Sequence, residues 1–209
     1  MHSAMRGTVL AAVVVVTSGC GGSKVLMPAR MDLGTFQRIG MVEFSSNADG
    51  ELQSMVSQEF IQKMQSAQPG VPVLELGNEQ GVLHAIGRDK LDHDALQAVA
   101  EKYKVDAVII GNLEVTDVTP KVSLSQILTS MDVQADVEAA LTTRILEAGS
   151  GATLWTRSAR SKQTVGHAGL DSSGGFHFGA SDPDAAYGSL VDDLVYSVTQ
   201  DFRSYWAKQ

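Results

Sequence analysis

The sequence predicts an α/β fold in which a mixed β-sheet is packed with three helices, a long β-hairpin comes late in the chain, and a C-terminal helix closes the core. Three observations predict it. Short apolar runs alternate with amphipathic segments in the first half of the chain, two long segments of alternating polarity flank a glycine-bearing turn in the second half, and apolar residues recur at helical spacing near the end. Helices between early strands and a hairpin among later strands favour a mixed sheet covered by helices.

The first half of the chain is expected to begin with a strand, a helix and a second strand. Residues 38–44 form a short apolar run bounded by a polar stretch, which indicates a buried strand. Residues 52–64 place an apolar side chain at every fourth position, which indicates an amphipathic helix that Pro69-Gly70 ends. Residues 71–76 predict the second strand, and residues 77–90 predict a glycine-bearing loop.

A second helix is expected after Asp92, whose side chain can accept a hydrogen bond from a free backbone N–H at the helix start. Residues 105–110 follow as an almost continuous apolar run, which is typical of a central strand covered on both faces. Beyond Gly111 the polarity alternates. The strand is therefore expected to run outward until one face meets water, and to be interrupted at Pro120.

The cleanest alternation of the chain runs from Val133 to Ile145 and predicts a long, half-buried strand. Gly149-Ser150-Gly151 predicts a hairpin turn, and residues 152–162 predict the partner strand. Residues 165–181 hold five glycines and are expected to form a long loop. Asp182 and Pro183 then begin a final helix whose apolar positions extend as far as Trp206.

The first twenty residues have the pattern of an export signal. Arg6 precedes the apolar run 9–16, which is shorter than the roughly 20 residues that a membrane-spanning helix needs. Thr17-Ser18-Gly19-Cys20 resembles a bacterial lipobox, with Thr17 where Leu is usual, and contains the only cysteine of the chain. We expect residues 1–19 to be a lipoprotein signal peptide, Cys20 to be lipidated, residues 20–32 to form a tether and residues 33–209 to form one domain. An ordinary secretory signal that leaves a free thiol, and an uncleaved anchor, are the alternatives.

Charge limits the partners of the chain. Without residues 1–19 it carries 15 Lys and Arg against 24 Asp and Glu, a formal charge of −9. This balance argues against a nucleic-acid partner, because such binding depends on clustered cations. It also argues against electrostatic docking on anionic lipid, so membrane attachment is expected through acyl chains on Cys20, of which stable anchoring needs more than one. Gly21 rather than Asp after Cys20 favours an outer-membrane anchor that faces the periplasm.

Four stretches resemble a known group of proteins in their sequence and order: residues 36–44, 96–115, 143–155 and the closing helix. Together with the lipobox they are similar to bacterial envelope lipoproteins related to the curli secretion channel subunit (CsgG-like). The fold of that family is shared by the lipoprotein activator of a penicillin-binding protein (LpoB-like) and by the amino-terminal domain of TolB. The resemblance implies an α/β sandwich and a role in the cell envelope.

No motif predicts catalysis, a metal or a cofactor. The histidines at positions 84, 93, 167 and 177 form neither HExxH nor a His pair beside a carboxylate cluster. Gly149-Ser150-Gly151 lacks the GxSxG spacing of a serine nucleophile, and residues 166–179 contain neither GxxxxGK nor GxGxxG. We therefore expect no enzyme, no metal and no cofactor, with an envelope hydrolase as the alternative.

Two segments are expected to bind a protein partner. Arg144, Arg157, Arg160 and Lys162 gather positive charge on the late hairpin of an otherwise acidic chain, where they could bind an acidic surface. The alternative is a solvated strand face that discourages edge pairing. The glycine-rich loop with Phe176 and Phe178 is the second segment. The sequence thus predicts a non-enzymatic, lipid-anchored adaptor in cell-envelope assembly, peptidoglycan synthesis or secretion, and it leaves homo-oligomerisation open.

A ring-forming subunit of an outer-membrane secretion channel is the remaining alternative. Channel subunits of the resembled family insert long alternating segments into the membrane, and each spanning strand needs about 9 to 11 residues with an outward apolar row. Residues 118–132 and 163–181 are the candidate insertions. The first holds Val122, Leu124 and Leu128, whereas the second lacks a sustained apolar row, so the sequence disfavours a pore.

Overall fold

The computed structural model describes residues 24–121, 134–166, 168–170, 176–178 and 182–208. Its largest sheet has the strand order β5-β2-β6-β7-β8, with β3 (Ser45–Ser46) paired to β6 off this path. The five strands of this order are β2 (Ile39–Val42), β5 (Val73–Gly77), β6 (Ala107–Lys121), β7 (Gln134–Glu147) and β8 (Thr153–Gly166). Neighbours are parallel from β5 to β6 and antiparallel from β6 to β8, so the predicted mixed sheet is confirmed.

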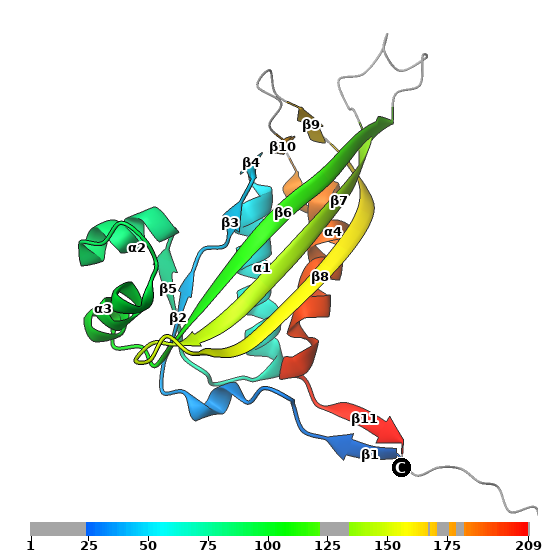
Figure 1. The fold of residues 1–209 in the computed structure, drawn as a ribbon. Helices are drawn as coiled ribbons and strands as arrows, with labels where there is room; N and C mark the ends of the chain where they lie inside the picture. The colour runs from blue at the N-terminus through cyan, green and yellow to red at the C-terminus, as the bar shows by residue number, and fades with distance from the viewer. Residues whose placement is uncertain (1–23, 122–133, 167, 171–175, 179–181, 209) are drawn as a thin grey trace, which may run out of the picture.

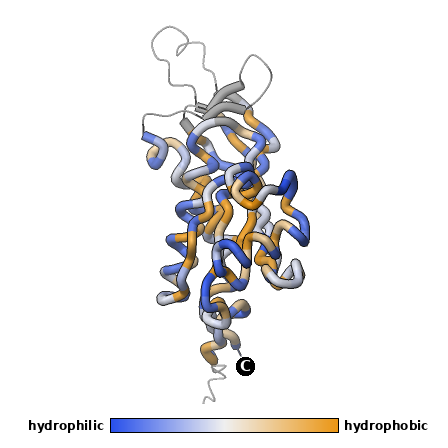
Figure 2. Tube along the Cα trace, turned by 90° about the vertical axis from the view of Figure 1, so that its left-hand side faces the viewer, coloured by the Kyte–Doolittle hydropathy of each residue, from blue (hydrophilic) through white to orange (hydrophobic). Residues whose placement is uncertain are grey.

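Helices lie against both faces of this sheet (Figure 1). Helices α1 (Leu52–Ala67) and α4 (Pro183–Val198) pack on one face, and α2 (Glu79–Ile86) and α3 (His93–Tyr103) pack on the other. The strands divide their side chains accordingly, because successive residues of a strand point to opposite faces. Ile39 and Met41 lie in the larger core with α1 and α4, whereas Val42 and Val108 lie in a second core with α2 and α3. Apolar segments accordingly gather in the interior (Figure 2).

Aromatic side chains pack together in the larger core around Phe60 of α1. Phe60 packs edge-on against Phe44 with ring centroids 5.1 Å apart and against Phe202 at 6.0 Å, while Trp155 lies 4.9 Å from Phe202. The Phe44 ring also lies against the backbone of β6 at Gly111, where an added Cβ would be 2.5 Å from Phe44 Cδ1. Only glycine leaves room for the ring at that position.

The prediction of a loop over residues 77–90 is wrong, because this segment contains helix α2. The described residues therefore contain four α-helices rather than three. Asn78 caps its start by accepting a hydrogen bond from the Gly81 N–H, and Gly87 ends it in the left-handed conformation at φ 67°. These are the usual start and stop signals of a helix. The glycines that suggested a loop therefore mark, in part, the end of a short helix.

Strand β6 continues through Pro120 to Lys121, which corrects the predicted interruption. β2 and β3 pair with β6 only as far as Leu113, so among the described strands only β7 pairs with β6 at Pro120. Proline lacks an N–H but is tolerated on a strand edge of this kind. The predicted loop 165–181 contains β9 (Ala168–Leu170) and β10 (Phe176–Phe178), and β10 joins β9 to β4 (Ala48–Gly50) in a small sheet.

The two ends of the described chain form a separate two-stranded ribbon, in which β1 (Lys24–Met27) pairs antiparallel with β11 (Tyr205–Lys208). Residues 24–27 thus form a strand within the segment expected to be a tether. Helix α4 ends at Val198, and the 3₁₀ turn η2 (Thr199–Phe202) redirects the chain, so Trp206 lies in β11 rather than on the final helix. A second 3₁₀ turn, η1 (Leu33–Thr35), begins at the cap Asp32. Within the described ranges, no helix has the length and apolar character needed to cross a membrane.

Candidate partner-binding face

Beyond the end that α2 and α3 cover, one face of β6, β7 and β8 is not covered by a described helix. In Figure 1 these strands lie in front of α1 and α4, and no described helix lies in front of their upper halves. Side chains in register across the three strands point to this side, because directly paired residues of antiparallel strands share a face. We call the following three rows the open face: Asn112, Thr142 and Ser158; Glu114, Ala140 and Arg160; and Asp117, Glu138 and Lys162.

The open face is divided by charge. Two of its acidic residues, Glu114 and Asp117, lie on β6, and the third, Glu138, lies on β7 opposite Lys162. Its basic residues Arg160 and Lys162 lie on β8, which forms an edge of the sheet. Arg160 and Lys162 are exposed, and neither side chain forms a hydrogen bond or ion pair with another residue in the part of the chain that the structure describes. Both cations are therefore available to a ligand outside the described chain.

The centre of the open face consists of small or half-buried side chains. Ala140, Thr142 and Glu138 on β7 are half-buried because β6 and β8 flank that strand on both sides. The Thr142 and Ser158 hydroxyls lie 2.9 Å apart and share a hydrogen bond. The β7 side chains of the open face are therefore less exposed than the acidic residues of β6 and the basic residues of β8 that flank them.

Arg157, the fourth residue of the predicted basic group, does not belong to the open face. It points to the opposite side of β8, where its Nη1 lies 3.2 Å from Asp201 Oδ2. The Trp155 Nε1–H donates a hydrogen bond to the same oxygen over 3.2 Å. Strand periodicity could have separated Arg157 from Arg160 and Lys162, because only residues two apart share a face.

Arg144 shares the side of Arg160 but lies two rows away, opposite Thr156 on β8. It is exposed, and it too forms no hydrogen bond or ion pair with another described residue. The structure therefore brings three of the four predicted basic residues to one side of the hairpin and uses the fourth in the packing of η2 against β8.

The other predicted residues are placed only in part. Phe176 and Phe178 lie in β10, parallel to β4 and antiparallel to β9. Strand β9 in turn contacts β6 and β7. Cys20, His167 and residues 122–133 lie outside the described residues, so the lipidation site and most of the first candidate insertion have no structural description.

Residues considered for catalysis or metal binding have other surroundings. Ser150 lies in the β7–β8 turn, where its hydroxyl donates to the Glu147 carboxylate and accepts from the Ala152 N–H at 3.2 Å. Exposed His93 begins α3, with its Nε2 3.2 Å from Gln97 Nε2. Among the described residues, no three His, Cys, Asp or Glu side chains lie close enough together to hold a metal ion.

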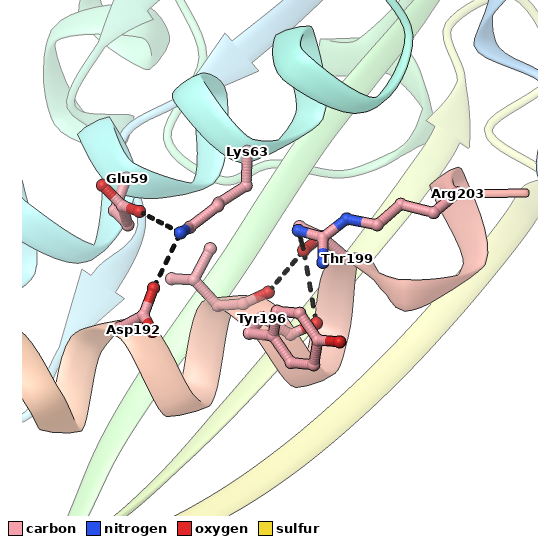
Figure 3. A network of polar contacts seen from close by, with 7 residues as sticks. Glu59, Lys63, Asp192, Tyr196, Thr199 and Arg203 are labelled. Carbon is pink, nitrogen blue, oxygen red and sulfur yellow. Dashed lines mark hydrogen bonds and ion pairs between the residues drawn. The ribbon is translucent and has the colours of Figure 1, made fainter.

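An open groove of about 480 Å³ lies between α1 and α4, on the covered side of the sheet. Beside it, Lys63 of α1 lies 2.7 Å from Asp192 of α4 and 3.1 Å from Glu59 (Figure 3). The hydrogen bond to Asp192 first, and that to Glu59 second, raise the pKa of Lys63. Figure 3 also shows Arg203 directed at Thr199, and its guanidinium carbon is 4.6 Å from the Tyr196 ring centroid. These contacts hold α4 and η2 in place.

Comparison with known proteins shows no family membership. No protein-family description matches the sequence, and no curated protein matches it. Several solved structures are similar at low identity. The PelC dodecamer from Paraburkholderia phytofirmans is 10% identical over 90% of this chain and 99% of that chain, with a TM-score of 0.46. Lipoprotein GNA1162 from Neisseria meningitidis is 15% identical over 61% and 83%, with a TM-score of 0.39.

The C-terminal domain of LpoB from Escherichia coli is similar to the same degree, at 10% identity over 62% of this chain and 85% of that chain, with a TM-score of 0.38. We draw no conclusion about function from likeness at this level. The CsgG-like resemblance stays a prediction from the sequence.

Proposed function

We propose that this chain is a non-enzymatic, lipid-anchored protein of the bacterial cell envelope, which binds another envelope protein through the open face. One observation carries the proposal: Arg160 and Lys162 are exposed on an uncovered sheet face and have no partner among the described residues. The lipobox at Cys20 supports the anchor. The pathway we propose is cell-envelope assembly, peptidoglycan synthesis or secretion.

The separation of acidic and basic residues on the open face determines how a partner would be oriented on it. A partner with an acidic patch would lie over β8, and its basic groups would meet Glu114 and Asp117 on β6. Complementary charges of this kind speed association and fix the register of two surfaces more than they add affinity. The small side chains of Ala140 and Thr142 on β7 allow close approach of the partner.

Phe176 and Phe178 are a second proposed contact, since β9 connects their segment to the same end of β6 and β7. Deleting residues 166–179 would remove β9 and β10 and leave β4 without its partner strand. Substitution of both phenylalanines by Ala is therefore the cleaner test. Reduced capture of the partner by this variant would support the contact, and unchanged capture would remove these residues from the site.

Site-specific crosslinking in intact bacteria tests the proposal. A photoreactive amino acid replaces Ser158 on the open face, and in a matched variant it replaces Ser66, which is exposed on α1 on the other side of the sheet. We expect Ser158 to capture a different envelope protein, identified by mass spectrometry, and Ser66 not to capture it. Equal capture from both positions would contradict the proposed face. A ladder at multiples of the chain's own mass would favour the ring-forming alternative.

A further inference from the structure

The ribbon of β1 and β11 exposes apolar side chains that the rest of the chain does not cover. Trp206 is 66% exposed and Leu26 is 53% exposed, and the two are directly paired across the strands. Figure 1 shows the ribbon extending from the base of the molecule, at the end opposite the far ends of β6 and β7. In Figure 2 hydrophobic residues appear again at this end, next to the C-terminus.

The two sides of the ribbon differ in chemistry. Leu26 and Trp206 share one side with a second directly paired set, Lys24 and Lys208, and all four residues are exposed. On the other side Val25 and Ala207 are half-buried, and the pair Met27 and Tyr205 is less exposed than Leu26 and Trp206, at 38% and 39%. One side therefore combines an apolar pair, including an indole, with two ammonium groups.

This combination is typical of the boundary between a membrane and water. Tryptophan and tyrosine concentrate at that boundary, where the ring contacts acyl chains and its polar atom stays in contact with water. Lysines beside a bilayer are attracted by anionic headgroups. In water, by contrast, the exposed Leu26–Trp206 pair is unfavourable, and an isolated two-stranded ribbon is marginally stable.

The base of the ribbon is fixed to the domain. Gln68, which follows α1, donates hydrogen bonds to the Met31 carbonyl at 2.6 Å and to the Phe202 carbonyl at 3.0 Å, and it accepts one from the Leu33 N–H at 2.7 Å. The Met31 N–H also donates to the Asp201 carbonyl at 3.0 Å. These bonds join the segments that enter and leave the ribbon, so its direction is set by the domain.

The position of Cys20 also places the ribbon near the membrane. Only Gly21, Gly22 and Ser23 separate it from Lys24. Four Cα-to-Cα steps span at most about 14 Å when fully extended, at roughly 3.3–3.6 Å per residue. An acylated Cys20 would therefore keep the start of β1 within that distance of the bilayer surface.

We infer that the side of the ribbon formed by Leu26, Trp206, Lys24 and Lys208 inserts into the headgroup region of the membrane that holds the Cys20 anchor. The inference rests on the proposed lipid anchor and extends it. This contact orients the domain relative to the bilayer. The far ends of β6 and β7 then point away from the membrane, and the open face does not contact it.

Fluorescence of the two tryptophans tests the inference. The chain from Cys20 onwards, which holds every described residue, is coupled through its single thiol to a maleimide lipid in phosphatidylethanolamine–phosphatidylglycerol vesicles. Brominated acyl chains then quench an inserted indole. We expect quenching and a shift to shorter wavelength in the wild type, and neither in W206F. That variant keeps Trp155, which packs against Phe202 and serves as an internal control.

The same fractional quenching of the wild type and W206F by brominated chains, with no wavelength shift of the wild type, would overturn the inference. A dimer in solution that W206F abolishes, without quenching on vesicles, would also overturn it, because a second copy would then cover the apolar pair. Failure of the anchor itself is distinguishable, since it appears as a missing acyl mass on Cys20 of protein isolated from cells, whereas the chemical coupling does not depend on cellular acylation.

Discussion

The guanidinium of Arg157 lies 3.2 Å from the carboxylate of Asp201, and this ion pair ties the edge strand β8 to the turn that follows α4. Asp201 is largely buried, with 13% of its side chain exposed, and it also accepts the Trp155 Nε1–H. Arg160, three residues further along the same strand, points to the other side of the sheet and is exposed. Two arginines that look equivalent in the sequence thus serve packing and surface chemistry separately.

The two arginines should therefore differ in their effect on stability. Arg157→Ala is expected to lower the free energy of unfolding by about 1–2 kcal/mol, because it removes a charge-assisted hydrogen bond from a largely buried carboxylate whose partner is partly exposed. Arg160→Ala is expected to change it by less than about 0.5 kcal/mol, as is usual for surface positions. Urea unfolding followed by tryptophan fluorescence compares the two, and equal losses would contradict this division.

The contact between Gly111 and the Phe44 ring predicts a second difference. Gly111→Ala is expected to destabilise the protein by about 1–3 kcal/mol, because the added methyl group overpacks the core and must displace the ring. Gly188→Ala is the matched control. Gly188 lies within α4, and apart from its chain neighbours and its own helix backbone no atom lies within 4 Å of an added Cβ. Alanine there is therefore expected to stabilise by about 0.5–1 kcal/mol. Thermal unfolding of both variants measures the effect, and a shift of the same sign in both would refute it.

Burial of Tyr187 makes the free energy of unfolding depend on pH in the alkaline range. Burial, followed by the charge of Glu51, raises its pKa to about 12, whereas the pKa of an unfolded tyrosine is about 10. Below pH 10 both states are protonated and the stability from this group is fully present. As the pH rises from about 10 towards 12, only the unfolded state loses the proton, and the folded state loses about 1.4 kcal/mol per pH unit.

Tyr187→Phe removes this dependence. Urea unfolding at pH 9 and pH 11 measures this. From the lower to the higher pH, the free energy of unfolding of the variant should rise by about 1.4 kcal/mol relative to that of the wild type. Other alkaline titrations, such as that of Lys63, are common to both proteins and cancel. A difference that stays constant between the two pH values would show that Tyr187 ionises equally in both states.

Periodicity in the sequence predicted the parts of the fold that repeat over many residues. The predicted alternating strand corresponds to β7, which is described from Gln134, and the four-residue spacing after Leu52 corresponds to α1. In both cases one buried face imposes the pattern. Periodicity did not predict the short elements. Helix α2 has eight residues, too few for a repeated pattern, and its caps Asn78 and Gly87 were the available signal.

Long-range contacts were also beyond the sequence pattern. The apolar spacing that ends at Trp206 predicts a continuous helix, but the chain turns at Thr199, where the Thr199 hydroxyl hydrogen-bonds back to the Val195 carbonyl at 2.7 Å. Pairing of β11 with β1, at the other end of the described chain, then replaces the helix. For the candidate site, composition alone grouped four basic residues, and only the strand register separated Arg157 from the others.

The most direct test of the proposed function is the affinity of the crosslinked partner for charge-reversed variants. R160E/K162E reverses the basic side of the open face, and R88E/K90E makes the same change in net charge between α2 and α3, where both residues are exposed. We expect the first variant to weaken binding by at least about tenfold, which corresponds to 1.4 kcal/mol, and the second to leave it unchanged. Equal affinities for the wild type and R160E/K162E would contradict a partner-binding role of the open face.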